Sequence, residues 1–324
     1  MGEVVVKIRA ALTCGTDLKT YRRGHPKLAF GPFGHEASGD ILAVGDNVAG
    51  FAVGDPVMWV QTAPCGSCAP CRASRENLCE HLTDDMALGA YGDILWLPAH
   101  VVARNLFPKP ANLSYIEAAF LEPFSCVVHG WRTLERALAT APIPESVAII
   151  GAGTIGLLHL AYARHAGIPA TVIARHKERL ELARAIGARQ AIAADFDSLP
   201  DGLAGSFAAV IECGGSVESW QEAVRLAAPG GRVLFFGGLP KSVHVPLDAT
   251  RIHYEEITCV GSFHFTPDDV RAARELMRAG IVPARELISG VLPMSSLAEA
   301  FHRLDSRMGF KYALVPEGEA PQWV

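Results

Sequence analysis

The stretch SVAIIGAGTIGLL, residues 146–158, decides the fold of this chain. Its apolar start, Val147–Ile150, predicts a buried strand, and the apolar residues after the glycines predict a helix. A strand, a glycine turn and a helix in this order are typical of dinucleotide binding. Gly151 allows the turn, Gly153 lets the backbone approach a pyrophosphate, and Gly156 lets the helix pack on the sheet. The alternative is an ordinary strand-to-helix turn without a ligand.

The pattern after this turn alternates strands and helices, which predicts a doubly wound parallel sheet of the Rossmann type. Thr154 and Ile155 lie inside the turn and join its glycines as expected cofactor contacts, because helix N-termini attract phosphate. We predict strands at 170–174, 208–212, 232–237 and 257–260, with helices at 177–186 and 217–226. Helices at 267–279 and 295–304 and a last strand at 312–315 follow.

Length and charge narrow the class of protein. The 324 residues are enough for about two domains. A net charge of −5 gives no indication of a nucleic-acid or membrane-surface partner. No apolar run approaches the roughly 20 residues of a membrane span, and the N-terminus lacks a signal-like apolar region. We therefore expect a cytoplasmic protein.

Short strands and turns dominate the chain before the glycine turn, which predicts a β-barrel-like domain. Strands are expected at 2–11, 40–48 and 57–60, and another at 99–110. Residues 14–17 are expected to form a turn that is neither strand nor helix. A helix is expected at 113–120, an interruption at 121–123, and a second helix at 124–139.

Four cysteines occur within the fifteen residues CGSCAPCRASRENLC. This spacing matches a closed structural zinc site. A redox pair is the weaker alternative, since it requires two thiols at a helix start rather than four in a loop. The predicted ligands are Cys65, Cys68, Cys71 and Cys79.

A second, open zinc site is suggested by Cys14 and the pair His35-Glu36. Catalytic zinc takes three protein ligands and keeps one position open. Taken singly, a cysteine is more often a core thiol and a His-Glu pair is more often surface or capping chemistry. Glu122 is equally well explained as a carboxylate at a helix N-terminus.

Taken together, the motifs resemble the zinc-dependent medium-chain dehydrogenase/reductase family. These motifs are Cys14-Gly15-Thr16-Asp17, Gly34-His35-Glu36, the cysteine stretch, Leu121-Glu122-Pro123 and the glycine turn, in this order. Glu122-Pro123 points to its polyol (sorbitol-type) and threonine dehydrogenase branch. The resemblance implies an α/β protein: a GroES-like β-barrel catalytic domain at 1–123 and 265–324, with a zinc lobe at 65–79, and a Rossmann domain at 124–264.

The resemblance also implies roles for individual residues. Cys14 and His35 would ligate the catalytic zinc, with Glu36 or Glu122 as the third ligand. Three further residues have implied roles: Asp17 orients the histidine, Thr16 relays the substrate proton, and Lys311 lies near the cofactor phosphates and the Glu of the GHE motif. Of the residues that could reach the substrate, Trp59, Tyr91, Trp96 and His264, each is equally explained by packing.

The implied activity is hydride transfer between a secondary alcohol or polyol and a nicotinamide cofactor, with zinc as a Lewis acid. A homo-oligomer, dimer or tetramer, is implied as well. The alternatives are a zinc-free reductase of the same fold and a non-catalytic cofactor-binding relative. Two departures from the family stand out. Lys19 replaces a relay histidine, and relatives carry further residues ahead of Gly2, so residues 4–8 are expected to form an exposed edge strand.

The end of the second Rossmann strand predicts the cofactor. An acidic residue there normally binds the adenine ribose and selects NAD. Ala174 occupies that position, and Arg175 and Arg179 follow it. Arginine can hold a 2′-phosphate with a planar, bidentate donor set. We therefore predict a preference for NADP, with Arg175 as the main determinant and Arg179 as the secondary one.

Overall fold

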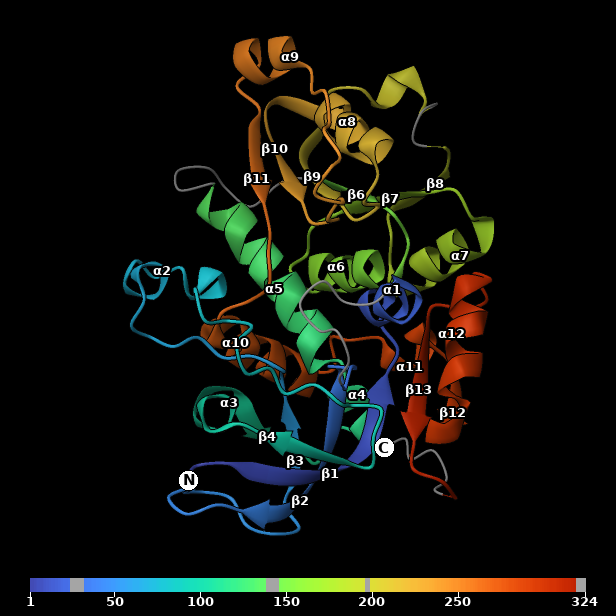
Figure 1. Ribbon diagram of the computed structural model, residues 1–324. Coiled ribbons are helices and arrows are strands. Elements are labelled where there is room, and N and C mark those ends of the chain that lie inside the picture. Colours follow the sequence, from blue (N-terminus) through green and yellow to red (C-terminus); the bar gives the residue numbers. More distant parts are fainter. Residues whose placement is uncertain (24–31, 138–145, 196–198, 319–324) are drawn as a thin grey trace. The chain divides into compact units, whose positions relative to one another are not determined.

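The computed structural model describes residues 1–23, 32–137, 146–195 and 199–318 of the chain. The chain divides into two compact units, one made of Met1–Ser125 with Phe265–Val324 and the other of Cys126–His264. Figure 1 labels the elements of both units and colours them by sequence. No helix among the described residues is both long and apolar enough to cross a membrane.

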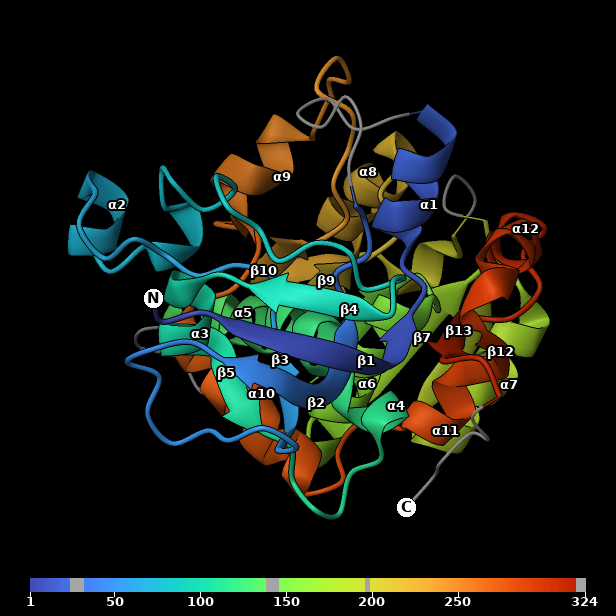
Figure 2. The same ribbon diagram turned by 60° about the horizontal axis from the view of Figure 1, so that its bottom comes forward.

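The first unit is built on a mixed sheet of seven strands, in the order β12-β13-β1-β2-β3-β5 with β4 paired to β1. Its strands are β1 (Val4–Leu12), β2 (Ala37–Val44), β3 (Pro56–Trp59), β4 (Ile94–Leu97), β5 (Leu106–Pro108), β12 (Ile288–Pro293) and β13 (Lys311–Val315). Strand β1 lies at the centre, between β2 and β4 over its first half (Figure 2). The prediction of an exposed edge at residues 4–8 is therefore wrong.

The alternation of β1 explains why it takes this central place. Val4, Val6 and Ile8 are almost completely buried, while the residues between them are partly exposed. Val6 is opposite Ile41 on one side and Leu95 on the other. A strand with neighbours on both sides leaves no free edge for another chain.

The helices of the first unit correct three predictions from the sequence. These helices are α1 (Gly15–Arg23), α2 (Ala69–Arg72), α3 (Ala99–Asn105), α4 (Tyr115–Ala118), α5 (Leu121–Arg136, which continues into the second unit), α10 (Pro267–Arg278), α11 (Ala284–Leu287) and α12 (Leu297–Asp305). Short 3₁₀ turns span Glu76–Leu78 and Met294–Ser296.

The turn predicted at residues 14–17 is instead the start of α1, with Asp17 in its first turn, where the helix dipole favours a carboxylate. The strand predicted at 99–110 is mostly α3. There Val101, Val102 and Asn105 fall on one buried face, so tertiary packing overrides the strand preference of valine. The interruption predicted at 121–123 is the first turn of α5, where Pro123 lacks only an N–H that needs no helical partner.

The second unit is a six-stranded sheet in the order β11-β10-β9-β6-β7-β8, and every pairing is parallel. Its strands are β6 (Val147–Ile150), β7 (Ala170–Ala174), β8 (Gln190–Ala193), β9 (Phe207–Glu212), β10 (Ala227–Phe235) and β11 (Thr258–Gly261). The connecting helices are α6 (Thr154–His165), α7 (Lys177–Ile186), α8 (Val217–Leu226) and α9 (Ala249–Tyr254), with a 3₁₀ turn at Asp201–Leu203.

This strand order confirms the predicted doubly wound parallel sheet. Strand β6 has β7 on one side and β9 on the other, and the chain moves outward in opposite directions from these two neighbours. Open α/β sheets bind ligands at such a switch point, outside the carboxyl ends of the strands. The glycine turn after β6 lies at this point.

Candidate active site and zinc centres

The glycine turn has the backbone geometry that its sequence predicts. Gly151 has a φ of +102°, which favours glycine. A Cβ atom on Gly156 would lie 1.9 Å from the carbonyl oxygen of Gly151, so only glycine fits at the helix start. Gly153 is the residue that caps α6 and offers no side chain of its own. The turn can therefore bring backbone amides close to a phosphate.

Arg175 and Arg179 lie where β7 meets the glycine turn. Arg175 follows the last residue of β7, and its Nε lies 3.3 Å from Asp195 Oδ1, with both side chains substantially exposed. Arg179 lies in the first turn of α7, and its Nη1 lies 3.8 Å from the position that a Cβ on Gly153 would take. The structure thus brings Arg179 beside the glycine turn and places Arg175 at the adjoining strand end.

A buried carboxylate that the sequence analysis missed supports the same edge of the sheet. Glu212 ends β9 opposite Ile150, and its Oε1 accepts hydrogen bonds from the amides of Gly214 and Gly215 and from the Ser219 hydroxyl. Burial raises the pKa of Glu212, against the lowering by these donors. A charged residue closing an apolar strand run was the available signal, because strand carboxyl ends meet at the ligand edge.

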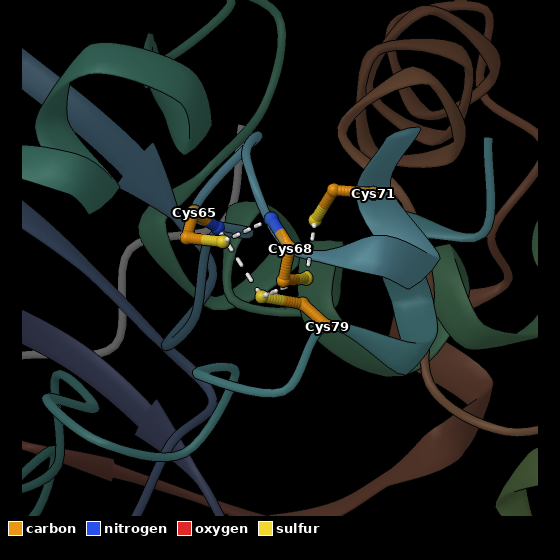
Figure 3. A group of neighbouring side chains, drawn as sticks. All are labelled: Cys65, Cys68, Cys71 and Cys79. Carbon is orange, nitrogen blue, oxygen red and sulfur yellow. Dashed lines mark hydrogen bonds between the residues drawn. The ribbon is translucent and has the colours of Figure 1, made fainter. Parts of the chain in front are cut away.

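The four cysteines of the lobe lie together, with all their sulfurs within 4.8 Å of one another (Figure 3). Cys68 Sγ is 3.3 Å from Cys71 Sγ and 3.8 Å from Cys79 Sγ. Zinc with Zn–S bonds of about 2.3 Å sets tetrahedral sulfurs roughly 3.8 Å apart. The donor set and its spacing therefore fit a structural zinc ion.

The surroundings of the lobe shift the pKa values of its thiols in different directions. The Ser67 amide and hydroxyl, together with the Cys68 amide, hydrogen-bond to Cys65 Sγ and lower the pKa of that thiol to about 5. Burial raises the pKa of Cys71 to about 12. Thiolates are the form that zinc binds, and metal binding releases their protons.

The second cluster brings together Cys14, His35 and Glu36, whose ligand atoms lie within 4.8 Å of one another. His35 Nδ1 is 3.0 Å from Asp17 Oδ1, so its Nε2 is the nitrogen that faces the cluster. Asp17 is itself held by the hydroxyl of Tyr91, at 2.7 Å from Oδ2. Asp17 thus lies where a residue that orients a histidine ligand must lie.

The surroundings of His35 favour its positively charged form. Burial alone would lower the pKa of His35, but the charges of Cys14 and Asp17 outweigh it and raise that pKa well above its ordinary value. A thiolate, an imidazole and carboxylates are a donor set that suits zinc.

Glu122, from the first turn of α5, reaches the same cluster. Its Oε2 lies 4.0 Å from His35 Nε2. Its Oε1 accepts a hydrogen bond of 3.0 Å from the side-chain amide of Gln61. Gln61 was not predicted from the sequence, and its position two residues beyond a strand and shortly before the cysteine lobe was the only available signal.

Lys311 lies against Glu36 in the interior. Its Nζ donates to Glu36 Oε2 and, at 2.8 Å, to the carbonyl oxygen of Thr13, and it is 3% exposed. Burial raises the pKa of Glu36 to about 7, against the lowering by Lys311 and His35. The structure brings Lys311 to the Glu of the GHE motif, and its predicted contact with cofactor phosphates stays a prediction.

The remaining predicted residues lie in different surroundings. Thr16 is exposed in α1, and its amide lies 3.4 Å from Cys14 Sγ. Lys19 is exposed in the same helix. Trp59 is buried in the core of the sheet, whereas Trp96 is 48% exposed. Of the aromatic candidates for the substrate pocket, Tyr91 therefore has the clearest link to the site, through Asp17.

Comparison with known proteins agrees with this arrangement. Residues 1–109 match the alcohol dehydrogenase GroES-like domain family, and residues 154–279 match the zinc-binding dehydrogenase family. The chain is 30% identical to L-threonine 3-dehydrogenase of Aeromonas salmonicida (strain A449), over 95% of this chain and 88% of the relative. It is 31% identical to sorbitol dehydrogenase of Halalkalibacterium halodurans, over 97% and 92%.

Among solved structures, one neighbour is a protein of Sinorhizobium meliloti 1021 assigned as a zinc-binding dehydrogenase and solved bound to NADP. It superposes with a TM-score of 0.87 at 27% identity, over 97% of this chain and 92% of that one. The predicted pair of folds, GroES-like and Rossmann, is thereby confirmed.

Proposed function

The chain belongs to the zinc-dependent medium-chain dehydrogenase/reductase family, and from this premise we propose that it transfers a hydride between a secondary alcohol or polyol and NADP. Residues 1–123 and 265–324 form the catalytic domain in this proposal, and 124–264 bind the cofactor. The closed cysteine lobe serves stability, and the open cluster serves chemistry. The expected setting is the cytoplasm, and a homo-oligomer is expected from the resemblance.

The catalytic zinc ligands in this proposal are Cys14, His35 and Glu122. Glu36 is itself part of the cluster, but its carboxylate forms an ion pair with Lys311. Glu122 is held on one oxygen by a neutral amide and presents the other toward His35. Zinc supplies Lewis acidity toward an alcohol oxygen when it is bound.

The chain's own residues keep the donors in place for this task. The carboxylate of Asp17 fixes the ring of His35 and the proton on its Nδ1, so that Nε2 is available as a ligand. Tyr91 holds Asp17, and its second contact, from the hydroxyl to the Leu12 carbonyl at 3.0 Å, ties the pair to β1. Thr16 lies in α1, two residues after Cys14, and is the proposed relay of the substrate proton.

The Rossmann unit binds the cofactor in this proposal, and NADP supplies the hydride acceptor when it is bound. Gly151, Gly153, Thr154, Ile155 and Gly156 form the pyrophosphate turn. Arg175 and Arg179 supply cations at the end of β7. Ala174 occupies the position at which an acidic residue usually selects NAD.

The observation that carries the proposal is the gathering of Cys14, His35 and Glu36 in one partly buried cluster, with Glu122 beside His35 and apart from the cysteine lobe. The test is a panel of polyols, amino alcohols and simple alcohols assayed with NADP and with NAD, on protein whose zinc content has been counted. We expect two zinc ions per chain and cofactor reduction by alcohols with a secondary hydroxyl. Turnover without zinc at the open site would favour the zinc-free reductase. No turnover with two zinc ions bound would favour a non-catalytic relative.

A further inference from the structure

The side-chain amide of Gln61 lies beside Glu122, inside the catalytic unit. Gln61 is 8% exposed, and its Nε2 donates to Glu122 Oε1 at 3.0 Å. An ionised carboxylate can only accept hydrogen bonds, so the amide nitrogen must face Glu122 and the amide oxygen must face away. The orientation of this amide is therefore determined by Glu122.

The oxygen of the Gln61 amide shows that a gain in folding stability does not explain why this position is a glutamine. Among the described residues, Gln61 Oε1 is buried without a hydrogen-bond partner. Leaving a buried acceptor unpaired costs about 1–3 kcal/mol. Methionine, with a similar length and no such acceptor, would avoid that cost. Within the part of the chain that the structure describes, the contact with Glu122 is the one polar interaction of this side chain.

The backbone around Gln61 is fixed from two sides. The amide of Ala87 donates to the Gln61 carbonyl at 2.8 Å. The side chain of Asn105 donates to the Thr62 carbonyl at 2.6 Å, and the Asn105 carbonyl accepts from the Val60 amide at 3.4 Å. Because the backbone is held on both sides of Gln61, the side chain that reaches Glu122 starts from a fixed backbone position.

We propose that Gln61 is a positioning residue that selects the orientation in which Glu122 presents its second oxygen to the catalytic metal. This inference rests on the function proposed above, with Glu122 as a zinc ligand. A carboxylate can rotate about its last side-chain bonds, and a donor fixed on one oxygen limits that rotation. The other oxygen, Oε2, then stays on the side of His35 Nε2, 4.0 Å away.

The test is Gln61→Met in the zinc-loaded protein. Loss of a partner that orients a metal ligand typically lowers metal affinity by about 10- to 100-fold. We expect this loss at the open site in chelator competition, with the lobe metal unaffected. In protein with Co(II) at the open site, the visible d–d bands should shift, and kcat should fall more than KM rises.

Two further variants keep the test decisive. Gln221→Met is the matched control, because Gln221 also donates one amide hydrogen bond, to the Pro246 carbonyl at 3.0 Å, and lies in the other unit. Its metal affinity and Co(II) spectrum should equal those of the parent. Gln61→Asn keeps a buried amide but withdraws the donor by one methylene, and serves if the methionine variant does not fold.

The outcomes separate this inference from the proposed function. If the parent binds zinc at both sites and turns over, but Gln61→Met and Gln61→Asn keep the parent's metal affinity and Co(II) spectrum, the positioning role is wrong. If the parent itself binds metal only in the lobe, the proposed function fails before Gln61 is tested.

Discussion

Lys311 forms a buried ion pair with Glu36, although 275 positions of sequence separate them. Lys311 is the first residue of β13, and Glu36 directly precedes β2. The two strands lie on either side of β1, so the sheet order brings these two distant segments together beside the cluster of Cys14, His35 and Glu36. The pair places a permanent cation beside the cluster and offsets the charge of one of its two carboxylates.

Removing this cation should destabilise the catalytic unit. In Lys311→Met, the Glu36 carboxylate loses its charge partner in a buried position, and breaking a buried pair in this way typically costs about 3–5 kcal/mol. We expect a loss of this size in the free energy of unfolding, measured by denaturant titration near neutral pH. The double variant Lys311→Met with Glu36→Gln should recover most of it. Equal stabilities of the single and double variants would show that the unpaired Glu36 carboxylate is not the source of the loss.

Cofactor preference should depend on Arg175. One charge-assisted hydrogen bond is worth about 1.5–3 kcal/mol, or roughly a ten- to hundredfold change in affinity. Arg175→Ala should raise the KM for NADP by about that factor and leave the KM for NAD nearly unchanged. Arg184→Ala, on the α7 helix that follows Arg175, is the control and should change neither value. Equal use of both cofactors by the parent protein would contradict the assignment of this strand end.

A buried histidine should make the Rossmann unit sensitive to acid. His159, in α6, packs against the rings of Trp131 and Phe236, and neither ring nitrogen has a hydrogen-bond partner among the described residues. Burial lowers the pKa of His159 from 6.5 to about 3. Below pH 6.5 the unfolded chain therefore binds a proton that the folded chain does not, so stability falls as the pH falls toward 3 and is fully present above 6.5.

The measurement is the free energy of unfolding as a function of pH. His159→Leu should remove up to about 1.4 kcal/mol per pH unit from the acid slope. The exposed His165 on the same helix provides the control, since His165→Leu should follow the parent. Loss of zinc in acid affects all three proteins alike and cancels in the comparison. An unchanged slope in His159→Leu would mean that the folded protein accepts this proton.

The glycine turn and the cysteine lobe could be predicted from the sequence because the residues that form each of them are close together in the chain. A strand, a tight turn and a helix occur within residues 146–158, and the four thiols occur within one loop. Strand β8 was missed because its residues are only half buried and carry little apolar pattern. The helix α3 was missed because its adjacent valines favour a strand until the packing of its inner face is known.

The open cluster could be predicted only in part, because its chemistry is not local in the sequence. Its candidate ligands come from segments far apart in the chain, and the resemblance to a family, rather than spacing, joined them. Gln61 could not be predicted, because an amide two residues beyond a strand has no pattern of its own. The partner of Glu36 depends on the order of strands in the sheet, which a sequence pattern does not specify.

The zinc content and turnover of Cys14→Ser test the central claim, that the open cluster binds the metal that does the chemistry. Cys14 contributes to this cluster alone, and the lobe keeps all four of its own thiols. We predict that the variant keeps one zinc ion per chain, folds as the parent does, and loses alcohol-dependent reduction of NADP. Two zinc ions per chain with the parent's turnover would contradict the account.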